Sequence, residues 1–172
     1  MNELQPPNAH HVRAAQGWLE LGCEAEANEE LEKVTPDLSE HPDVLEVRWG
    51  IWAAAGNWEA CLTVAIALVE AAPQRLIGWI HRSYALHELK RTAEATKLLA
   101  PAVDLFPRDW LIRYNLACYA CQLGNSAEAW DWLQKASKIG DKREIRLMAL
   151  DDPDLEPLRA RMLERGEPPA KD

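Results

Sequence analysis

The sequence repeats with a period of 34 residues, and this constrains its fold more than any other feature. Gly22, Gly56 and Gly124 keep this spacing, and Lys90 occupies the remaining position of their column. The other columns with the same spacing are Ala27, Cys61, Ala95 and Ala129; Trp18, Trp52, Leu86 and Ala120; and Pro73 with Pro107. A fixed period of this length is typical of proteins built from stacked repeats of one supersecondary unit.

Each period contains the pattern of two helices. The segment Val44–Ala55 is strongly apolar, Gly56 and Asn57 interrupt it, and Trp58–Ala72 follows with apolar residues at helical spacing until Pro73. Glycine supplies the left-handed turn that ends a helix, and proline cannot continue one. We therefore expect one helix hairpin per period. Because a single hairpin cannot bury its apolar face, neighbouring hairpins must stack to form the core.

Composition excludes several classes of function. The 172 residues are 48% hydrophobic and 27% charged, which is typical of one soluble globular domain. A net charge of −9 argues against a nucleic-acid partner, because nucleic-acid binding needs a positive surface. The longest apolar stretch, Cys61–Ala72, is too short to cross a membrane, and four cysteines are too few for a disulfide framework. We expect a cytoplasmic protein that binds neither nucleic acid nor membranes.

The negative charge is concentrated in one segment. Residues 20–46 contain ten acidic residues and a single basic one, Lys33, so this segment alone accounts for the net charge of −9. An acidic run on a helix usually faces solvent. The alternative is that this segment docks a basic partner.

The pattern of bulky and small residues within each period resembles that of the tetratricopeptide repeat (TPR) family. The third period carries the family's signature most completely, with Trp79, Ser83, Leu86, Ala95, Leu99, Ala102 and Pro107 at its positions. The resemblance implies an all-α fold, a right-handed α-solenoid of about four TPR helix hairpins plus C-terminal capping helices. The hairpins are expected at about 8–41, 42–74, 75–108 and 109–140, with an N-terminal tail at 1–7, capping helices at 141–166 and a frayed tail at 167–172.

Departures from the pattern predict local features. Pro36 should shorten the second helix of the first repeat and leave a loop over Thr35–His41, and Pro101 should break a helix near Ala100. In the last segment, Asp141 and Asp152 are expected to cap short helices. The final helix should bury an apolar stripe, which consists of Leu155, Leu158 and Met162.

The TPR resemblance also implies a binding groove on the first helices of the hairpins. The candidate groove residues are Val12, Gln16, Glu46, Gly50, Ile80, Tyr84, His87, Tyr114, Asn115, Cys118 and Cys121. The lysine, asparagine and arginine residues with which one TPR sub-family binds acidic chaperone tails are missing, since Val12, Gln16, Val47, Ile77 and His81 stand at those positions. We therefore expect a scaffold whose groove binds a peptide or partner helix through apolar anchors.

Two alternatives remain open at this point. The chain can be a self-associating structural TPR module, a homo-oligomer, whose groove is covered by its own tail. The pair Cys118 and Cys121 forms a CxxC motif, which in other contexts binds metal or acts as a redox site. Two small residues tolerated in a closely packed helix explain the same pair, and no second ligand pair accompanies it. We expect no metal, no cofactor and no enzymatic activity, because the sequence contains none of the common catalytic motifs.

Overall fold

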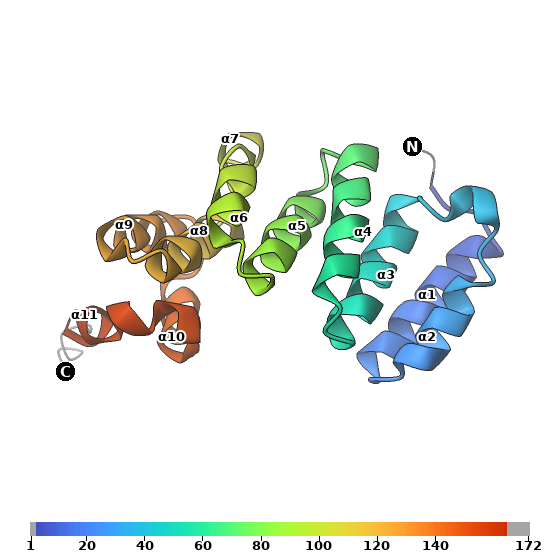
Figure 1. Ribbon diagram of the computed structural model, residues 1–172, viewed down its shortest axis with the longest axis horizontal. Coiled ribbons are helices and arrows are strands. Elements are labelled where there is room, and N and C mark those ends of the chain that lie inside the picture. The colour runs from blue at the N-terminus through green and yellow to red at the C-terminus, as the bar shows by residue number, and fades with distance from the viewer. Residues whose placement is uncertain (1–2, 165–172) are drawn as a thin grey trace, which may run out of the picture. The chain divides into compact units, whose positions relative to one another are not determined.

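The computed structural model describes residues 3–164, and its regular elements are all helices (Figure 1). They fall into two compact units, with the boundary between Arg91 and Thr92. The first unit contains α1 (Asn8–Glu20), α2 (Glu24–Leu31), the 3₁₀ turn η1 (Pro36–Leu38), α3 (Pro42–Ala54), α4 (Trp58–Ala71) and α5 (Leu76–Glu88). The second contains α6 (Thr92–Leu99), α7 (Ala102–Leu105), α8 (Leu111–Gln122), α9 (Ser126–Ser137), α10 (Lys142–Asp151), the 3₁₀ helix η2 (Pro153–Leu158) and α11 (Arg159–Glu164).

In the first unit, α1 pairs with α2 and α3 pairs with α4, while α5 packs against α3 and α4. Ala15 of α1 and Ala27 of α2 are fully buried where these two helices approach each other. The core of these helices consists of Leu4, Val12, Ala15, Ala27, Leu31, Val34, Val44, Val47 and Ile51. The small residues of the repeat therefore permit close helix contact, and the larger aliphatic side chains fill the space between hairpins.

In the second unit, α8 and α9 form the main hairpin, and α6 and α7 pack against α8. The 3₁₀ helix η2 contacts α8, α9, α10 and α11. Asp141 caps α10 by accepting hydrogen bonds from the backbone N–H groups of Arg143 and Glu144, both at 2.8 Å. The predicted cap at Asp141 is therefore confirmed.

The column of Gly22, Gly56, Lys90 and Gly124 marks equivalent turns. All four residues have positive φ angles, of 71°, 67°, 63° and 81° in that order. Left-handed backbone is natural for glycine and costs a residue with a side chain roughly 1 kcal/mol. Lys90 adopts it nevertheless, which shows that the turn geometry of the repeat persists where its usual residue has been replaced.

The proline predictions are confirmed in their main features. The helix before Pro36 ends at Leu31, and the loop that follows contains the 3₁₀ turn η1 before α3 begins at Pro42. Helix α6 ends at Leu99, and α7 begins only after Pro101, so the predicted break near Ala100 is present.

The C-terminal segment departs from its predicted form in one respect. Asp152 caps the next element as expected, by accepting a 2.9 Å hydrogen bond from the backbone N–H of Asp154. The single last helix expected there is instead 3₁₀ over η2 and α-helical only over α11, and Pro157, which has no N–H to donate, lies within η2. Leu155, Leu158 and Met162 are buried as predicted. The tail expected at 167–172 lies outside the described residues.

Within residues 3–164, no helix combines the length and the apolar character that crossing a membrane requires.

Candidate protein-interaction surface

A groove of about 650 Å³ runs along the first unit, lined by α1, α3, α5 and the segment before α1. Three of the predicted groove residues, Val12, Gln16 and Glu46, line it together with His81. These residues come from the first helix of three successive repeats, because the repeat places equivalent faces of these helices side by side. The structure thus places these three predicted residues around one cavity of the first unit.

The segment before α1 forms part of the groove. Leu4 is only 7% exposed and packs in the core cluster with Val12 and Val47. Glu3, Gln5 and Pro6 line the groove beside it, and Gln5 Nε2 donates to the backbone oxygen of Glu3 at 3.2 Å. An aliphatic side chain from an extended segment therefore fits against the α1–α3 surface.

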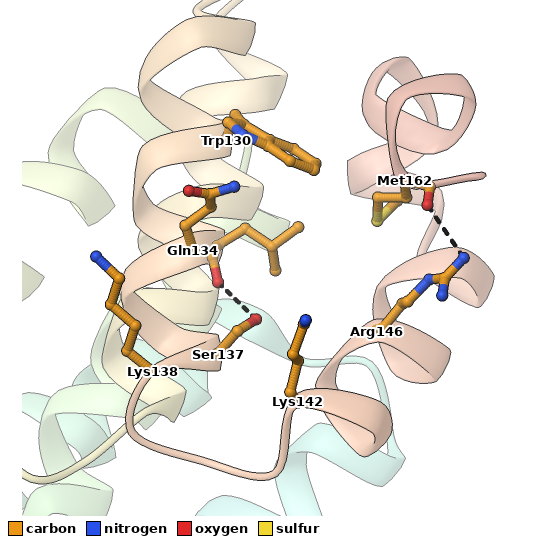
Figure 2. Close-up of a pocket in the computed structure, with 8 residues that line it drawn as sticks. Trp130, Gln134, Ser137, Lys138, Lys142, Arg146 and Met162 are labelled. Carbon is orange, nitrogen blue, oxygen red and sulfur yellow. Dashed lines mark hydrogen bonds between the residues drawn. The ribbon is translucent and has the colours of Figure 1, made fainter. Parts of the chain in front are cut away.

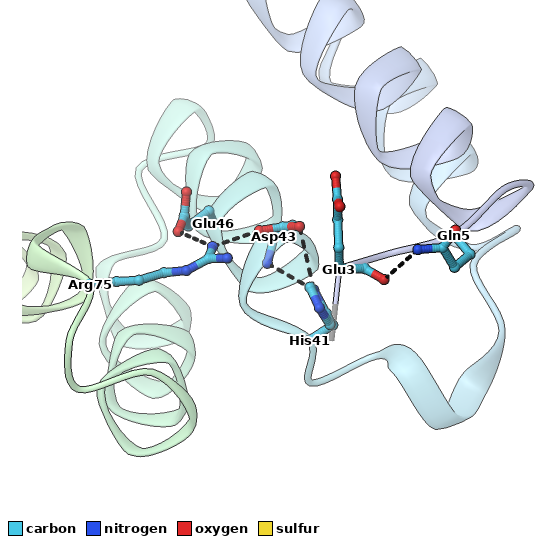
Figure 3. A network of polar contacts seen from close by, with 6 residues as sticks. All are labelled: Glu3, Gln5, His41, Asp43, Glu46 and Arg75. Carbon is cyan, nitrogen blue, oxygen red and sulfur yellow. Dashed lines mark hydrogen bonds and ion pairs between the residues drawn. The ribbon is translucent and has the colours of Figure 1, made fainter. Parts of the chain in front are cut away.

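A charged network lies at the start of α3 (Figure 3). Arg75 Nη1 contacts Asp43 Oδ1 at 2.6 Å and Glu46 Oε1 at 2.8 Å. Burial by itself would lower the pKa of Arg75, but the hydrogen bonds to Glu46 and Asp43 outweigh it and raise this pKa. The His41 ring nitrogen Nδ1 accepts from the Asp43 backbone N–H at 3.2 Å and so caps α3. The guanidinium of Arg75 therefore offsets much of the negative charge at this end of the groove.

An aromatic cluster, made of Trp49, Trp58, His81 and Tyr84, adjoins the groove. The ring of His81 is stacked on Trp49 with centroids 3.6 Å apart, and Tyr84 meets Trp58 edge-to-face at 5.6 Å and Trp49 at 6.4 Å. Tyr84 keeps 41% of its surface exposed. Burial lowers the pKa of His81 to about 4, so its ring is neutral at pH 7. The cluster therefore offers an uncharged aromatic surface, with His81 also lining the groove.

The remaining predicted groove residues of the first unit are less accessible. Ile80 and His87 are buried. A Cβ atom on Gly50 would lie 2.5 Å from Leu19 Cδ2, so the lack of a side chain at Gly50 makes room for Leu19 of α1. Tyr84 is thus the predicted groove residue of α5 with the most exposed side chain.

The predicted residues of the second unit, Tyr114, Asn115, Cys118 and Cys121, all lie on α8, and η2 packs against this helix. Tyr114 is 4% exposed, and its hydroxyl donates to Asp152 Oδ2 at 2.8 Å. The Cys118 Sγ lies 3.5 Å from the same oxygen. Cys121 is also buried, and Asn115 is half-buried. In this conformation the cap at Asp152 covers the face that the repeat register assigns to the groove.

The thiols of α8 are in an environment that disfavours thiolates. Burial is the main cause that raises the pKa of Cys118, and the carboxylates of Asp152 and Asp154 raise it further. The pKa of Cys121 is raised by burial and then by Asp154. A redox or nucleophilic cysteine needs a lowered pKa. The CxxC motif therefore lacks the electrostatic setting of a reactive thiol pair.

The fold brings Cys118 of α8 together with two aspartates of the C-terminal segment as candidate metal ligands. One ligand atom each from Cys118, Asp152 and Asp154 lies within 4.8 Å of the others. Asp152, however, already accepts hydrogen bonds from the backbone N–H of Asp154 and the hydroxyl of Tyr114. Capping and hydrogen bonding account for this arrangement without a cation.

Two residues of the surface carried no signal in the sequence. Leu4 stands alone among polar residues and prolines, in a segment expected to be a tail. Arg75 stands directly before α5, outside the repeat columns. Leu4 packs against, and Arg75 pairs with, residues of segments that are distant in sequence.

No protein-family model and no curated protein matches the sequence. Solved structures do resemble it. A structure of MamA from Desulfovibrio magneticus RS-1, covering residues 41 to the end, has a TM-score of 0.71 and 17% identity over 94% of this chain and 94% of that chain. A MamA structure designated MSR-1 has a TM-score of 0.65 and 21% identity over 78% of this chain and 76% of that chain.

A third similar structure is a kinesin light chain from Podosopora anserina with nearly identical TPR-like repeats. Its TM-score is 0.63, with 18% identity over 94% of this chain and 88% of that chain. At these identities the likeness establishes the fold. The chain has a TPR-like, all-α helical-repeat fold, which confirms the fold class inferred from the 34-residue period.

Proposed function

We propose that the chain is a protein-interaction scaffold that binds an extended peptide or a partner helix along the groove of its first unit. The observation that carries this proposal is the continuity of an open groove with the aromatic cluster of α3, α4 and α5. Aromatic side chains that are partly exposed beside a groove are typical anchors for protein partners.

The chemistry of the groove favours recognition by shape and apolar contact. Its floor contains Leu4, Val12 and Val47, which are buried aliphatic side chains. Asp43 and Glu46 are already paired with Arg75, so they contribute little attraction for a cationic ligand. A partner with an aliphatic or aromatic side chain next to Tyr84 fits this surface best. We expect an affinity on the order of micromolar, since a single groove of this size must also offset the ordering of the peptide.

The binding role belongs to the first unit because the corresponding face of α8 is buried. Tyr114 and Cys118 contact Asp152, and Gln122 Nε2 donates to the backbone oxygen of Asp154 at 3.1 Å. This covered face supports a second candidate function, a structural module that self-associates and uses no peptide groove. Light scattering over a concentration series separates the two, since only the structural module forms concentration-dependent assemblies without a ligand.

Photo-crosslinking in the native cell extract tests the scaffold. A photoreactive phenylalanine derivative replaces Gln16 in one variant and Tyr84 in another, and a third variant carries it at Thr63, which is exposed on α4. The scaffold function predicts that the first two variants crosslink a shared partner and that the Thr63 variant does not. Purified partner should then bind Tyr84→Ala at least about tenfold more weakly than Thr63→Ala.

The opposite results would overturn this function. If positions 16 and 84 capture no common protein, or if position 63 captures the same one, the groove is not the binding surface. The proposal places this scaffold in the cytoplasm. It assigns the chain no catalytic activity and no cofactor, and its partners are neither nucleic acids nor membranes.

A further inference from the structure

The second unit contains a pocket of about 380 Å³ between α9, α10 and α11 (Figure 2). Its apolar floor is formed by Trp130, Leu133 and Met162. Leu133 and Met162 are buried, and the guanidinium of Arg161 lies 4.3 Å from the ring centroid of Trp130. The pocket thus has a defined apolar floor formed by two different helices.

The charged lining of this pocket is entirely basic. Lys138, Lys142 and Arg146 line it, and no carboxylate of the described residues does. Within residues 3–164, neither Lys138 nor Lys142 forms an ion pair. Arg146 donates through Nη2 to the backbone oxygen of Met162 at 3.1 Å, while its buried Nε has no hydrogen-bond partner there. Among the residues that the structure describes, three cationic side chains and no carboxylate line this pocket, in a chain whose net charge is −9.

The turn between α9 and α10 fixes the positions of the two lysines. Lys138 directly follows the last residue of α9 and Lys142 begins α10, with Gly140 between them. A Cβ atom on Gly140 would lie 2.7 Å from Trp110 Cγ, so the turn packs tightly on this ring. In Figure 2, the Lys142 side chain points into the space between α9 and Arg146. The two lysines therefore lie on either side of a closely packed turn.

We propose that this pocket binds an acidic peptide segment of a partner protein. The carboxylates of the peptide face Lys142 and Arg146, with Lys138 at the margin. An aliphatic or aromatic side chain next to these carboxylates packs on Leu133 and Met162. The basic residues favour the carboxylates of the peptide, and the apolar floor favours its apolar side chain. Together they favour a peptide that carries both groups.

A nucleic acid does not fit the same surface. Polyanions bind to extended basic stripes. Here Asp131, Asp141 and Glu144 are exposed beside the basic residues of α9 and α10, so acidic side chains interrupt the basic surface around the pocket. This site belongs to the second unit and the groove to the first. The peptide-binding proposal for this pocket is therefore tested independently of the scaffold function proposed for that groove.

The test is selection of a random peptide library displayed on phage against the full chain. The expected result is enrichment of sequences with two or more Asp or Glu residues next to Leu, Ile, Met or Phe. A peptide synthesised from the enriched consensus is then measured by fluorescence anisotropy. Lys142→Glu should weaken its binding at least about tenfold, because it reverses a charge that contacts the ligand.

A matched control keeps the result interpretable. Lys135→Glu makes the same charge change on α9 outside the pocket, where Lys135 pairs with Asp131 at 2.6 Å, and it should leave the affinity within about twofold. Tyr84→Ala should also leave it unchanged, which distinguishes this site from the groove. Lys142 is exposed at the first position of α10, where an acidic residue is favourable, so Lys142→Glu should fold normally.

Three outcomes would overturn the inference. The library can yield no acidic consensus, the peptide can bind Lys142→Glu as well as wild type, or Lys135→Glu can weaken it equally. A fourth outcome is self-association of the chain, which sedimentation velocity of the wild-type protein measures. If the protein self-associates and Lys142→Glu abolishes this, the occupant is a second copy of the chain and not a partner protein.

Discussion

The imidazole of His81 lies parallel to the indole of Trp49, with 3.6 Å between ring centroids and 5° between planes. Trp49 belongs to α3 and His81 to α5, so this stack joins the two helices. Trp49 also contacts Trp58 and Tyr84. Trp49 is therefore the residue that contacts every other member of the aromatic cluster.

The buried position of His81 predicts a loss of stability in mild acid. Its pKa is about 4 in the folded chain and 6.5 when unperturbed, so between these values the unfolded chain binds the proton more readily. The contribution of neutral His81 is fully present above pH 6.5 and decreases as pH falls towards 4, by at most about 3 kcal/mol. Urea denaturation at pH 7.5 and 4.5 measures this change.

His81→Phe is the control, because it keeps a ring on Trp49 but cannot be protonated. The wild-type chain should lose more stability than this variant over the same pH range. Equal losses in the two proteins would show that other groups cause the pH dependence.

Asp152→Ala should destabilise the protein by about 2–4 kcal/mol. The loss of the cap costs about 1 kcal/mol, and the buried hydroxyl of Tyr114 loses its acceptor at a cost of about 1–3 kcal/mol. The neighbouring Asp151→Ala, at an exposed position, should change the free energy of unfolding by less than about 0.5 kcal/mol. Chemical denaturation of the two variants compares them directly, and similar values would disprove the role given to Asp152.

Alanine should have opposite effects at Gly17 and Gly78. A Cβ on Gly78 would lie 3.1 Å from Leu68 Cγ and 3.2 Å from Val69 Cγ2, so Gly78→Ala forces α4 and α5 apart and should cost about 1 kcal/mol or more. At Gly17, in the middle of α1, a Cβ meets nothing within 4 Å. Gly17→Ala should therefore stabilise by about 0.5–1 kcal/mol through the lower entropy of the unfolded chain. Thermal denaturation should show melting-temperature shifts of opposite sign, and an increase in both would contradict the close approach at Gly78.

Thiol reactivity should be limited to one cysteine in the native protein. Burial raises the pKa of Cys61 to about 11, and the pKa values of Cys118 and Cys121 are also raised. Cys23 is half-buried and lies in the turn before α2. A chromogenic disulfide reagent at pH 8 should detect one fast equivalent in the native state and four in denaturant. Cys23→Ser should remove the fast phase, and a second fast equivalent would show that the α8 thiols are accessible.

The local features of the fold were predictable because neighbouring residues determine them. The turn at Lys90 follows from the repeat column, the break after Leu99 follows from Pro101, and the start of α10 follows from Asp141. Each depends on backbone conformation or capping within a few residues, which a period and a few residue types reveal.

Whether the candidate binding face of α8 is exposed depends on contacts between distant segments, and these contacts leave no periodic pattern in the sequence. The register places Tyr114 and Cys118 on the expected face of α8, but it carries no information on whether that face is open. Their partner Asp152 lies 38 residues from Tyr114, in a segment outside the repeat. The packing of Leu4 in the first unit was hidden for the same reason, since a single aliphatic residue among polar neighbours has no periodicity.

The contact between η2 and α8 has a consequence for engineering. A further hairpin fused after residue 140 would need the surface of α8 and α9 that Asp152–Leu158 already occupies. Designed extensions of this protein should therefore be inserted upstream of α8, with everything from α8 onward transplanted as one terminating module. A longer derivative could then contain any chosen number of hairpins, while the native C-terminal segment still covers the exposed face of its last hairpin.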